Sequence, residues 1–555
     1  MVVSLLQSCN NSKTKKEKEI INDPASIDAV VKKNIESYLL SASENNGKID
    51  DSLQLTFLPV LQNYYETNDY LPEWSSREKW TPLTGDLLNY LAIAASDGLY
   101  REDYHFSAIS ALKRILDIDS VKRMDAILWT KADILLTDAF MHVIQDLKQG
   151  RLQPDSQAWK NDPAKYKTFF AANLNRLKKG ESLDSIVKSV QPIIKGYWLL
   201  KAGINTFIEQ MDSGKYTYVP YPYKPGDMED SVLFAKKLLL RLSESGITNK
   251  NTGTDSLQLA VLIKKYQQQK KLAADGKISS ALIRLLNTTD LERFNRIAIT
   301  LDRYKQMPET MPEKYILVNL PAYNLQVWDT DTVVFTSKII CGKPATSTPF
   351  ITSAISDLVI YPTWTVPSSI IKKEMLPGLK KNSNYLARKG LQLYNNKGEL
   401  IDPSTVDWTK YSKGIPYKIQ QGSGDNNALG VIKFNFNNPF DVYLHDTNQR
   451  YLFKNAKRAM SHGCVRVEDW EKLAFYIARN DSLKNAMAGG DTLKYNTDSI
   501  SAWIAKKEKH RIDVKNKIPL FIRYFGCEGF NGSIKFYDDI YDEDKKIKEK
   551  YFVLK

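Results

Sequence analysis

At 555 residues, the chain is long enough for three or four domains of ordinary size, and its 43% hydrophobic and 26% charged residues are typical of globular proteins. No stretch reaches about 18 uninterrupted apolar residues, which excludes a membrane-spanning helix. The formal net charge is +14, but the lysines are scattered among acidic residues in no compact basic stripe, which argues against nucleic-acid binding.

The first 27 residues are predicted to be a signal-like remnant and a polar tether. A short apolar run ends in Leu-Gln-Ser-Cys, with the cysteine at position 9, and a charged stretch follows. This resembles a bacterial lipoprotein signal, in which Cys9 would carry the lipid and tether the protein to a membrane. The apolar run has only eight residues and no basic leader, so an irregular terminus with a chance cysteine is the alternative.

Helical periodicity dominates the next part of the chain. Apolar residues recur at three- and four-residue spacings and predict an α-helical scaffold domain over residues 28–217, in which His105 and His142 are lone, structural histidines. The proline- and aromatic-rich stretch 218–227 cannot continue a helix and is predicted to be a linker. Three short amphipathic segments then predict a small helical module over residues 228–290.

Beyond residue 300 the pattern becomes that of strands. The stretch YILVNLPAYNLQVWDTDTVVFTSKIICG alternates apolar and polar residues, with a turn at Asp329 to Asp331. We expect a mainly β domain over residues 300–490, interrupted at about 370–418 by a helical and loop-like insertion. Residues 491–555 are expected to add a helix and strands that pack on the scaffold domain and on the core of this β domain. The predicted fold class is therefore multidomain α+β.

The four cysteines are too few and too dispersed for a disulfide framework. No two of them form a CxxC pair, which argues against a zinc ribbon or a thioredoxin-like site, and we expect neither a metal nor a cofactor. Cys341 and Cys527 lie in apolar surroundings and are predicted to be small buried hydrophobic residues.

Cys464, by contrast, lies in a chemical context. Nucleophilic cysteine catalysis needs a base beside the thiol and donors for an oxyanion. His445 lies 19 residues before Cys464 and His462 two before it, so either could supply the base and hold a thiolate–imidazolium pair. The alternatives are a buried structural thiol, or a metal site made by Cys464 and the two histidines, whose spacing suits a metal poorly.

The residues around Cys464 suggest further roles. Gly463 lets the chain turn sharply, so that backbone N–H groups of residues 462–464 could form an oxyanion hole. The helical pattern VEDWEKLAFYIARN places Glu468 and Asp469 in a first helical turn, and a thiolate near that helix N-terminus would gain about 0.3–1 kcal/mol. Arg466 could grip a carboxylate through both of its terminal nitrogens.

The stretch resembles the signature of L,D-transpeptidases with a YkuD-type catalytic domain. That signature is a histidine, a spacer of roughly sixteen residues, and then Ser-His-Gly-Cys, an apolar residue and Arg or Asn. Here these positions hold His445 and residues Ser461 to Arg466. From about residue 45 onward the chain also resembles the large YcbB-like branch, and the sequence motifs that carry this resemblance are YPTWTVP, DNNALGVIKFNFNNPFDVYLHDT and FYDDIYDED. The stretch LAADGKISSALIRLLN is similar to a peptidoglycan-binding module.

The resemblance implies roles for individual residues. Cys464 would be the nucleophile and His445 the general base, with His462 shaping the loop. Asp446 would orient His445 through either its side chain or its backbone carbonyl. Four residues would contact substrate, namely Arg466, Ser461, Tyr443 and Trp364, although Trp364 could equally be a core residue. The insertion would cap the site.

The implied reaction is acyl transfer between peptidoglycan stem peptides. Cys464 would attack a tetrapeptide donor, expel the terminal D-alanine and form a thioester, and a diamino-acid side chain of a second stem would resolve it into a 3–3 cross-link. Carbapenems would acylate the same cysteine, in a lipid-anchored protein of the bacterial envelope facing the periplasm. The rival functions are L,D-carboxypeptidase or cross-link cleavage at the same site, a non-enzymatic wall-binding protein, and a papain-like peptidase. The papain-like reading is disfavoured because the histidine precedes the cysteine.

Overall fold

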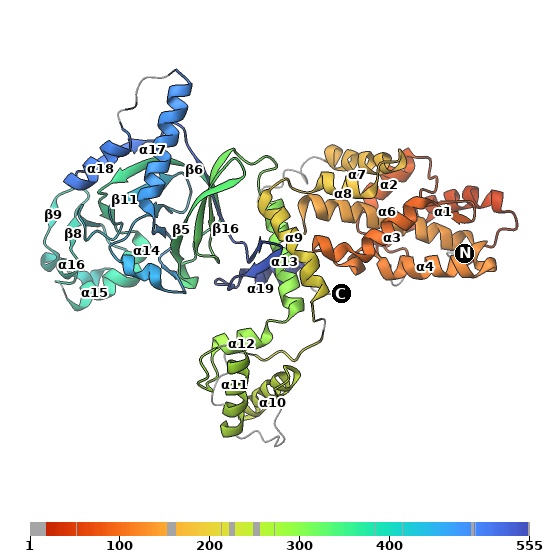
Figure 1. The fold of residues 1–555 in the computed structure, drawn as a ribbon, viewed down its shortest axis with the longest axis horizontal. Coiled ribbons are helices and arrows are strands. Elements are labelled where there is room, and N and C mark those ends of the chain that lie inside the picture. Colours follow the sequence, from red (N-terminus) through yellow and green to blue (C-terminus); the bar gives the residue numbers. More distant parts are fainter. Residues whose placement is uncertain are drawn as a thin grey trace, which may run out of the picture. The chain divides into compact units, whose positions relative to one another are not determined.

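The computed structural model describes residues 18–50, 53–152, 163–212, 214–220, 228–247, 256–270, 272–382, 384–412, 414–489, 493 and 495–552. The chain divides into two compact units. The first comprises Met1–Glu309, Cys527–Lys535 and Lys548–Lys555, and the second comprises Thr310–Gly526 and Phe536–Ile547. Figure 1 labels their helices and strands.

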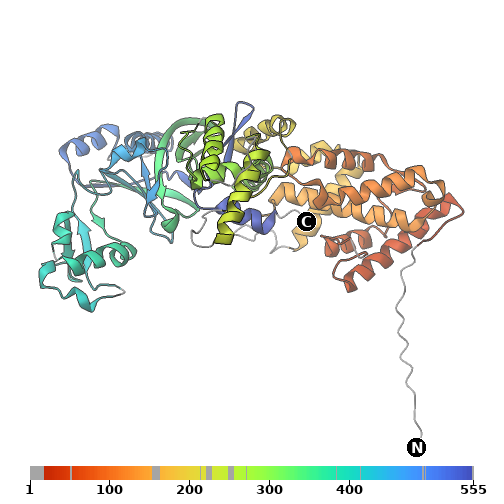
Figure 2. The same cartoon turned by 90° about the horizontal axis from the view of Figure 1, so that it is seen from below.

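The first unit is mainly helical, as the periodicity of its sequence predicts. Its scaffold helices are α1 (Ile27–Glu44), α2 (Leu58–Thr67), α3 (Pro82–Ala92), α4 (Phe106–Ile118), α5 (Ser120–Arg123), α6 (Ala126–Gln149), α7 (Pro163–Lys178), α8 (Leu183–Val190) and α9 (Lys195–Glu209). A short hairpin joins β1 (Ser75–Ser76) to β2 (Lys79–Trp80). Figure 2 shows α1 to α6 as red and orange helices lying alongside one another.

Helix α6 is the centre of this scaffold. Most of its 24 residues are buried, so its sequence lacks a clear polar face. Its buried carboxylates are satisfied by neighbouring segments: Asp133 accepts hydrogen bonds from the backbone N–H groups of Glu73 and Trp74, both at 2.9 Å. His105 and His142 each face an aspartate, Asp138 at 2.9 Å and Asp146 at 3.5 Å respectively.

Three further helices follow the scaffold in the sequence, as expected for the small module. They are α10 (Met228–Glu244), α11 (Ser256–Gln269) and α12 (Ser280–Asn287). Leu238, Ile263 and Leu286 are among the residues of their common core, which is separate from the scaffold core. Helix α13 (Asp290–Lys305) continues the chain, and the hairpin β17 (Cys527–Phe530) and β18 (Ser533–Phe536) contributes to the first unit.

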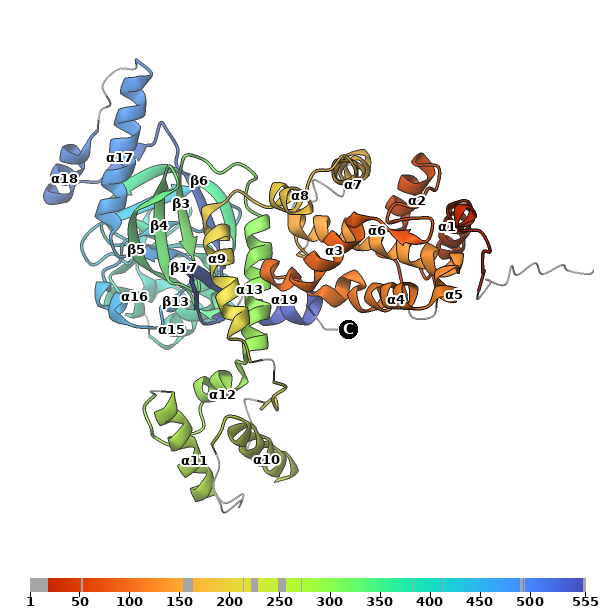
Figure 3. The same ribbon diagram turned by 45° about the vertical axis from the view of Figure 1, so that its right-hand side comes forward.

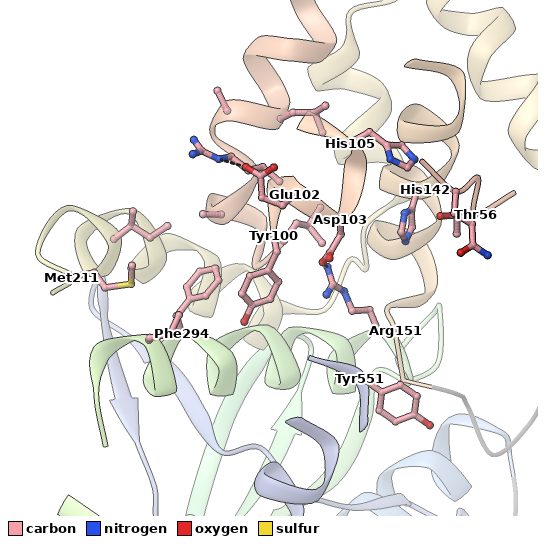
Figure 4. Close-up of a pocket in the computed structure, with 18 residues that line it drawn as sticks. Thr56, Tyr100, Glu102, Asp103, His105, His142, Arg151, Met211, Phe294 and Tyr551 are labelled. Atoms are coloured by element: carbon pink, nitrogen blue, oxygen red, sulfur yellow. Dashed lines mark hydrogen bonds and ion pairs between the residues drawn. The ribbon is translucent and has the colours of Figure 1, made fainter. Parts of the chain in front are cut away.

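A cavity of about 830 Å³ lies within the first unit. Tyr100, Arg151 and Phe294 are among its lining residues, together with His142 (Figure 4). Arg151 is already paired with Asp103 at 2.7 Å, and its guanidinium lies 5.2 Å from the ring centroid of Tyr100. The charged groups that face this cavity therefore have partners within the protein.

The second unit is built on a sheet that closes on itself. Within the described residues it has ten strands, in the order β11-β12-β14-β5-β4-β3-β16-β6-β15, with β13 beside β5, and the pairing of β11 with β6 completes a barrel. Figure 3 shows β3, β4 and β5 side by side. The bounds are β3 (Lys314–Asn319), β4 (Asn324–Asp329), β5 (Thr332–Gly342), β6 (Ile351–Ile360), β11 (Ile432–Phe436), β12 (Leu444–His445), β13 (Ala459–Ser461), β14 (Val465–Val467), β15 (His510–Asp513) and β16 (Pro519–Arg523).

The predicted hairpin of β4 and β5 is confirmed, with Thr330 and Asp331 in the left-handed conformation at its turn. The sheet extends beyond residue 490, because β16 pairs in parallel with β3 in the middle of the barrel. Helices α17 (Trp470–Met487) and α18 (Thr497–Lys506) follow the cysteine segment, and α19 (Glu543–Tyr551) begins in the second unit and ends in the first. Cys341 and Cys527 are buried, as expected.

The predicted insertion is a small lobe with its own sheet and core. Strands β7 (Trp364–Thr365), β10 (Lys418–Gln421), β8 (Leu391–Tyr394) and β9 (Leu400–Ile401) form the sheet in that order, beside α14 (Ser368–Ile370), a π-helix (Ile371–Met375), α15 (Leu376–Lys381) and α16 (Tyr385–Arg388). Leu386, Leu393 and Trp408 lie in its core. The lobe spans residues 364–421, wider than the expected 370–418, because β7 and β10 pair and close it.

Candidate active site

Strand register brings the predicted residues together. In the parallel pair β12–β14, Leu444 pairs with Val465 and His445 with Arg466. Leu444 and Val465 belong to the barrel core, and side chains alternate along a strand, so His445 and Arg466 lie on the opposite face. Cys464 lies two residues before Arg466 and shares its face. This register therefore puts His445 and Cys464 on the same face of the sheet, on adjacent strands about 4.8 Å apart.

The loop that carries Cys464 is held by hydrogen bonds. The hydroxyl of Ser461 donates to the carbonyl of Cys464 at 2.6 Å and accepts from the N–H of Gly463 at 3.1 Å. Thr348 donates to the carbonyl of Gly463 at 2.8 Å. Gly463 has φ = +126°, a conformation that only glycine adopts without strain. The buried Ser461 side chain therefore shapes this loop, and it is already committed to intramolecular bonds rather than to the expected contact with substrate.

The predicted oxyanion hole is reduced by one donor. The N–H of Gly463 is bonded to Ser461, and the N–H of Val465 donates to the carbonyl of Tyr443 at 3.1 Å. Within the described part of the chain, the N–H groups of His462 and Cys464 donate to no other protein atom. These two groups are the donors that remain for a developing oxyanion.

The sulfur of Cys464 is half-buried among polar and aromatic groups. It lies 3.8 Å from the carbonyl oxygen of Asp441, and the side chain of Tyr443 lies close enough to interact with both the sulfur and Trp364. Burial raises the pKa of the Cys464 thiol, and Tyr443, Lys433 and Arg466 partly offset this effect. Tyr443, expected to contact substrate, thus lies beside the nucleophile, and Trp364, expected to do the same, lies beside Tyr443.

His445 is fully enclosed, and this changes the expected state of the pair. Burial, followed by the charge of Arg466, lowers the pKa of His445 to about 3, while the backbone carbonyls of Asp446 and Leu429 act in the opposite direction. Both shifts favour the uncharged forms, a neutral imidazole and a protonated thiol, over the expected thiolate–imidazolium pair, because both charged forms lose hydration in this site.

Asp446 does not direct its carboxylate at the imidazole. The carboxylate accepts hydrogen bonds from the backbone N–H of Val431 at 2.9 Å and from Arg450 at 2.5 and 3.0 Å. Gly430 makes room for it, since a Cβ at that position would lie 2.2 Å from an Asp446 oxygen. Of the two roles left open for Asp446, the structure therefore favours its backbone carbonyl, which raises the pKa of the His445 ring.

His462 faces the inserted lobe. Its Nε2 lies 2.5 Å from the carboxylate of Glu374, which is also 3.8 Å from the ammonium of Lys343. This contact joins the loop of the nucleophile to the π-helix of the lobe. The side chain of Arg466 lies at the site with Nη1 3.2 Å from Gln449, and burial lowers its pKa.

The helix after Cys464 begins later than predicted. Strand β14 intervenes, and α17 starts at Trp470 with Asp469 as its N-cap, so Glu468 and Asp469 precede the first turn. A three-residue strand spans about 10 Å, which removes the sulfur from the helix N-terminus. The expected stabilisation of a thiolate by that helix was therefore wrong.

Sequence reasoning missed three residues that support the site. Lys433 pairs in register with His445, so its side chain shares the face of the candidate catalytic residues. Thr348 and Tyr541 brace the loop, with the Tyr541 hydroxyl 2.7 Å from the carbonyl oxygen of Gly342. The alternation in Ile432-Lys433-Phe434 could have placed Lys433 on the outer face of its strand, but no sequence signal gives the register.

Cys9 lies outside the described residues. Within the parts of the chain that are described, no helix has the length and apolar character needed to cross a bilayer. In the same parts, no cluster of three or more His, Cys, Asp or Glu side chains is arranged to hold a metal ion.

Comparison with known proteins identifies similar chains. A protein of Haemophilus influenzae that carries the provisional name L,D-transpeptidase is 32% identical over 252 residues, which cover 45% of this chain and 48% of that protein, so the match spans about half the length of the relative. Two solved structures also match at 11% identity: an L,D-transpeptidase from Mycobacterium smegmatis (TM-score 0.18; 38% of this chain, 58% of that one) and a mutant of the Enterococcus faecium L,D-transpeptidase (TM-score 0.17; 39% and 52%).

Two domain families match the chain itself. Residues 313–484 match the L,D-transpeptidase catalytic domain of the YkuD family, and residues 59–203 match the family described as a scaffold domain. The first match contains His445, Cys464 and the inserted lobe. The chain thus carries a YkuD-type L,D-transpeptidase catalytic domain together with a scaffold domain.

Proposed function

We propose that this protein is a peptidoglycan L,D-transpeptidase that forms 3–3 cross-links through a thioester on Cys464. The observation that supports the proposal is the register of β12 and β14, which puts His445 and Cys464 on one face of adjacent strands within a region that matches the catalytic domain of this family. A neutral imidazole is the form that can accept a proton.

In the proposed first step, His445 takes the proton of the Cys464 thiol as the sulfur attacks the carbonyl of the third residue of a tetrapeptide stem. The carbon–sulfur bond forms while the oxygen becomes negative, facing the N–H groups of His462 and Cys464. Collapse of this intermediate expels the terminal D-alanine, whose nitrogen receives the proton from the imidazolium. Cys464 is left as a thioester.

In the second step, the side-chain amine of a second stem attacks the thioester and His445 accepts its proton. The thiol is regenerated and a 3–3 cross-link is formed. Exclusion of water favours the amine over hydrolysis, and the inserted lobe is a candidate for that role because Glu374 contacts His462 at the nucleophile loop. Arg466 is the candidate group for binding a substrate carboxylate.

The test is incubation of the purified chain with tetrapeptide muropeptides, followed by mass analysis of the products. Dimers joined 3–3, absent with Cys464→Ala, support the proposal. Tripeptide without dimer would instead identify an L,D-carboxypeptidase. If no product formed at all, a non-enzymatic wall-binding function would be the remaining alternative. The same cysteine is expected to capture a carbapenem covalently.

The remaining parts fit a role at the cell wall. We propose that Cys9 is lipidated and tethers the protein in the bacterial envelope, facing the periplasm, where this substrate is found. In that case Cys9→Ser moves the protein from the membrane fraction to the soluble fraction. The helical module of α10 to α12 is a candidate glycan-binding element, and pull-down with isolated peptidoglycan, with and without the module, tests this.

A further inference from the structure

Lys433 is an ammonium group placed within the barrel wall beside the nucleophile. Its neighbours in β11, Ile432 and Phe434, are buried in the barrel core, so its own side chain points to the opposite face. In register it pairs with His445, which in turn pairs with Arg466. Three adjacent strands thus place Lys433, His445 and Arg466 in one row across the face that carries Cys464.

The aromatic ring of Tyr443 fixes where the ammonium lies. Nζ of Lys433 is 4.0 Å from the centroid of this ring, within the range of a cation–π interaction. The same tyrosine also interacts with the sulfur of Cys464. The ammonium and the sulfur therefore both lie close to one ring.

Lys433 forms no ion pair with a carboxylate among the described residues. A half-buried ammonium without a close counter-ion is unfavourable, and burial accordingly lowers the pKa of Lys433. The charges that favour its protonated form are, in order, those of Cys464, Asp357 and Asp441. An anion on the sulfur of Cys464 would thus supply a nearby counter-charge for this ammonium.

We propose that Lys433 stabilises the Cys464 sulfur as an anion once His445 has accepted its proton. The proton moves from Sγ to an imidazole nitrogen, no other bond changes, and the new negative charge is formed near the Lys433 ammonium. This assignment deepens the proposed function and rests on it for its biological meaning. It also gives the site a second cation, which leaves Arg466 available for a substrate carboxylate.

The charged and titratable groups around the sulfur determine how readily Cys464 becomes an anion. Lys433 on β11 and Arg466 on β14 favour the anion, as does the hydroxyl of Tyr443. Asp441, whose carbonyl oxygen contacts the sulfur, and Asp357 on β6 are the acidic groups near Lys433. The imidazole of His445 is neutral above about pH 3 and adds no charge until the proton moves.

The test compares Lys433→Met, which keeps the apolar stem and removes the charge, with Lys433→Arg, which keeps the charge. Lys418→Met is the matched control, because Lys418 is an exposed strand lysine in the lobe of the same unit. The readout is the ultraviolet absorbance of the Cys464 thiolate against pH, taken as the difference from Cys464→Ser in each background. Melting temperatures establish that each variant is folded.

We expect Lys433→Met to raise the pKa of Cys464 by about one unit, and to slow alkylation of Cys464 by iodoacetamide at pH 8 about tenfold. Lys433→Arg should titrate close to the parent chain, and Lys418→Met should be unchanged. A folded Lys433→Met with the parent titration, or an equal shift in Lys433→Arg, would overturn the assignment. No peptidoglycan is used, so failure to cross-link would refute the proposed function without touching this result.

Discussion

Acidifying the solution from pH 8 to pH 5 tests whether the His445 ring is neutral or protonated when a substrate binds. Burial lowers the pKa of this ring to about 3, so at pH 5 about 99% of the protein holds it neutral and ready to accept a proton. A ring with the ordinary pKa of about 6.5 would be neutral in only about 3% of molecules at the same pH. The two cases differ about 30-fold in the amount of competent base.

The assay is the rate of covalent capture of a carbapenem by Cys464, followed by intact mass between pH 4.5 and pH 8. Because the sign of the shift keeps the base available in acid, we expect a nearly constant rate across this range. His445→Gln is the control: without the base, the rate depends on free thiolate and should rise about tenfold per pH unit. An acid limb centred near pH 6.5 in the parent chain would refute the reasoning.

Three further substitutions probe the supports of the site. Gly463→Ala should lower the free energy of unfolding by about 1–2 kcal/mol, because φ is +126° at this position, and denaturant unfolding measures this loss. The same substitution should slow acylation of Cys464, which a carbapenem capture assay measures. Arg450→Leu leaves the buried carboxylate of Asp446 without its ion pair and should lower the melting temperature by a few degrees, whereas an unchanged melt would argue against that pair. Glu374→Gln weakens the contact with His462, so backbone amide exchange in the lobe should rise while exchange in the barrel stays unchanged.

Local patterns were enough to predict much of the catalytic unit. The alternation between residues 314 and 342 predicted β3 to β5 and their turn, since strands half-buried in a barrel wall repeat every two residues. The amphipathic repeats likewise predicted the scaffold helices and the three helices of the small module. Cys464 and His445 stood out because they are rare residues in a chain with four cysteines and five histidines.

The features that could not be predicted from the sequence depend on pairing between distant segments of the chain. Strand β16 enters the barrel between β3 and β6, and no local pattern marks it as part of that sheet. Lys433 becomes a neighbour of Cys464 only through the registers of β11 with β12 and of β12 with β14. The lowered pKa of His445 follows from burial, which is a property of the assembled domain rather than of any short stretch.

The most direct measurement is peptide mapping by mass spectrometry of the full chain quenched in acid during turnover of a tetrapeptide muropeptide. The account predicts a tripeptide-stem adduct on Cys464. The adduct should disappear when a diamino-acid acceptor is added in excess, and His445→Gln should form it much more slowly. Turnover with Cys464 unmodified at every time point, or an adduct on Cys341 or Cys527 instead, would contradict it.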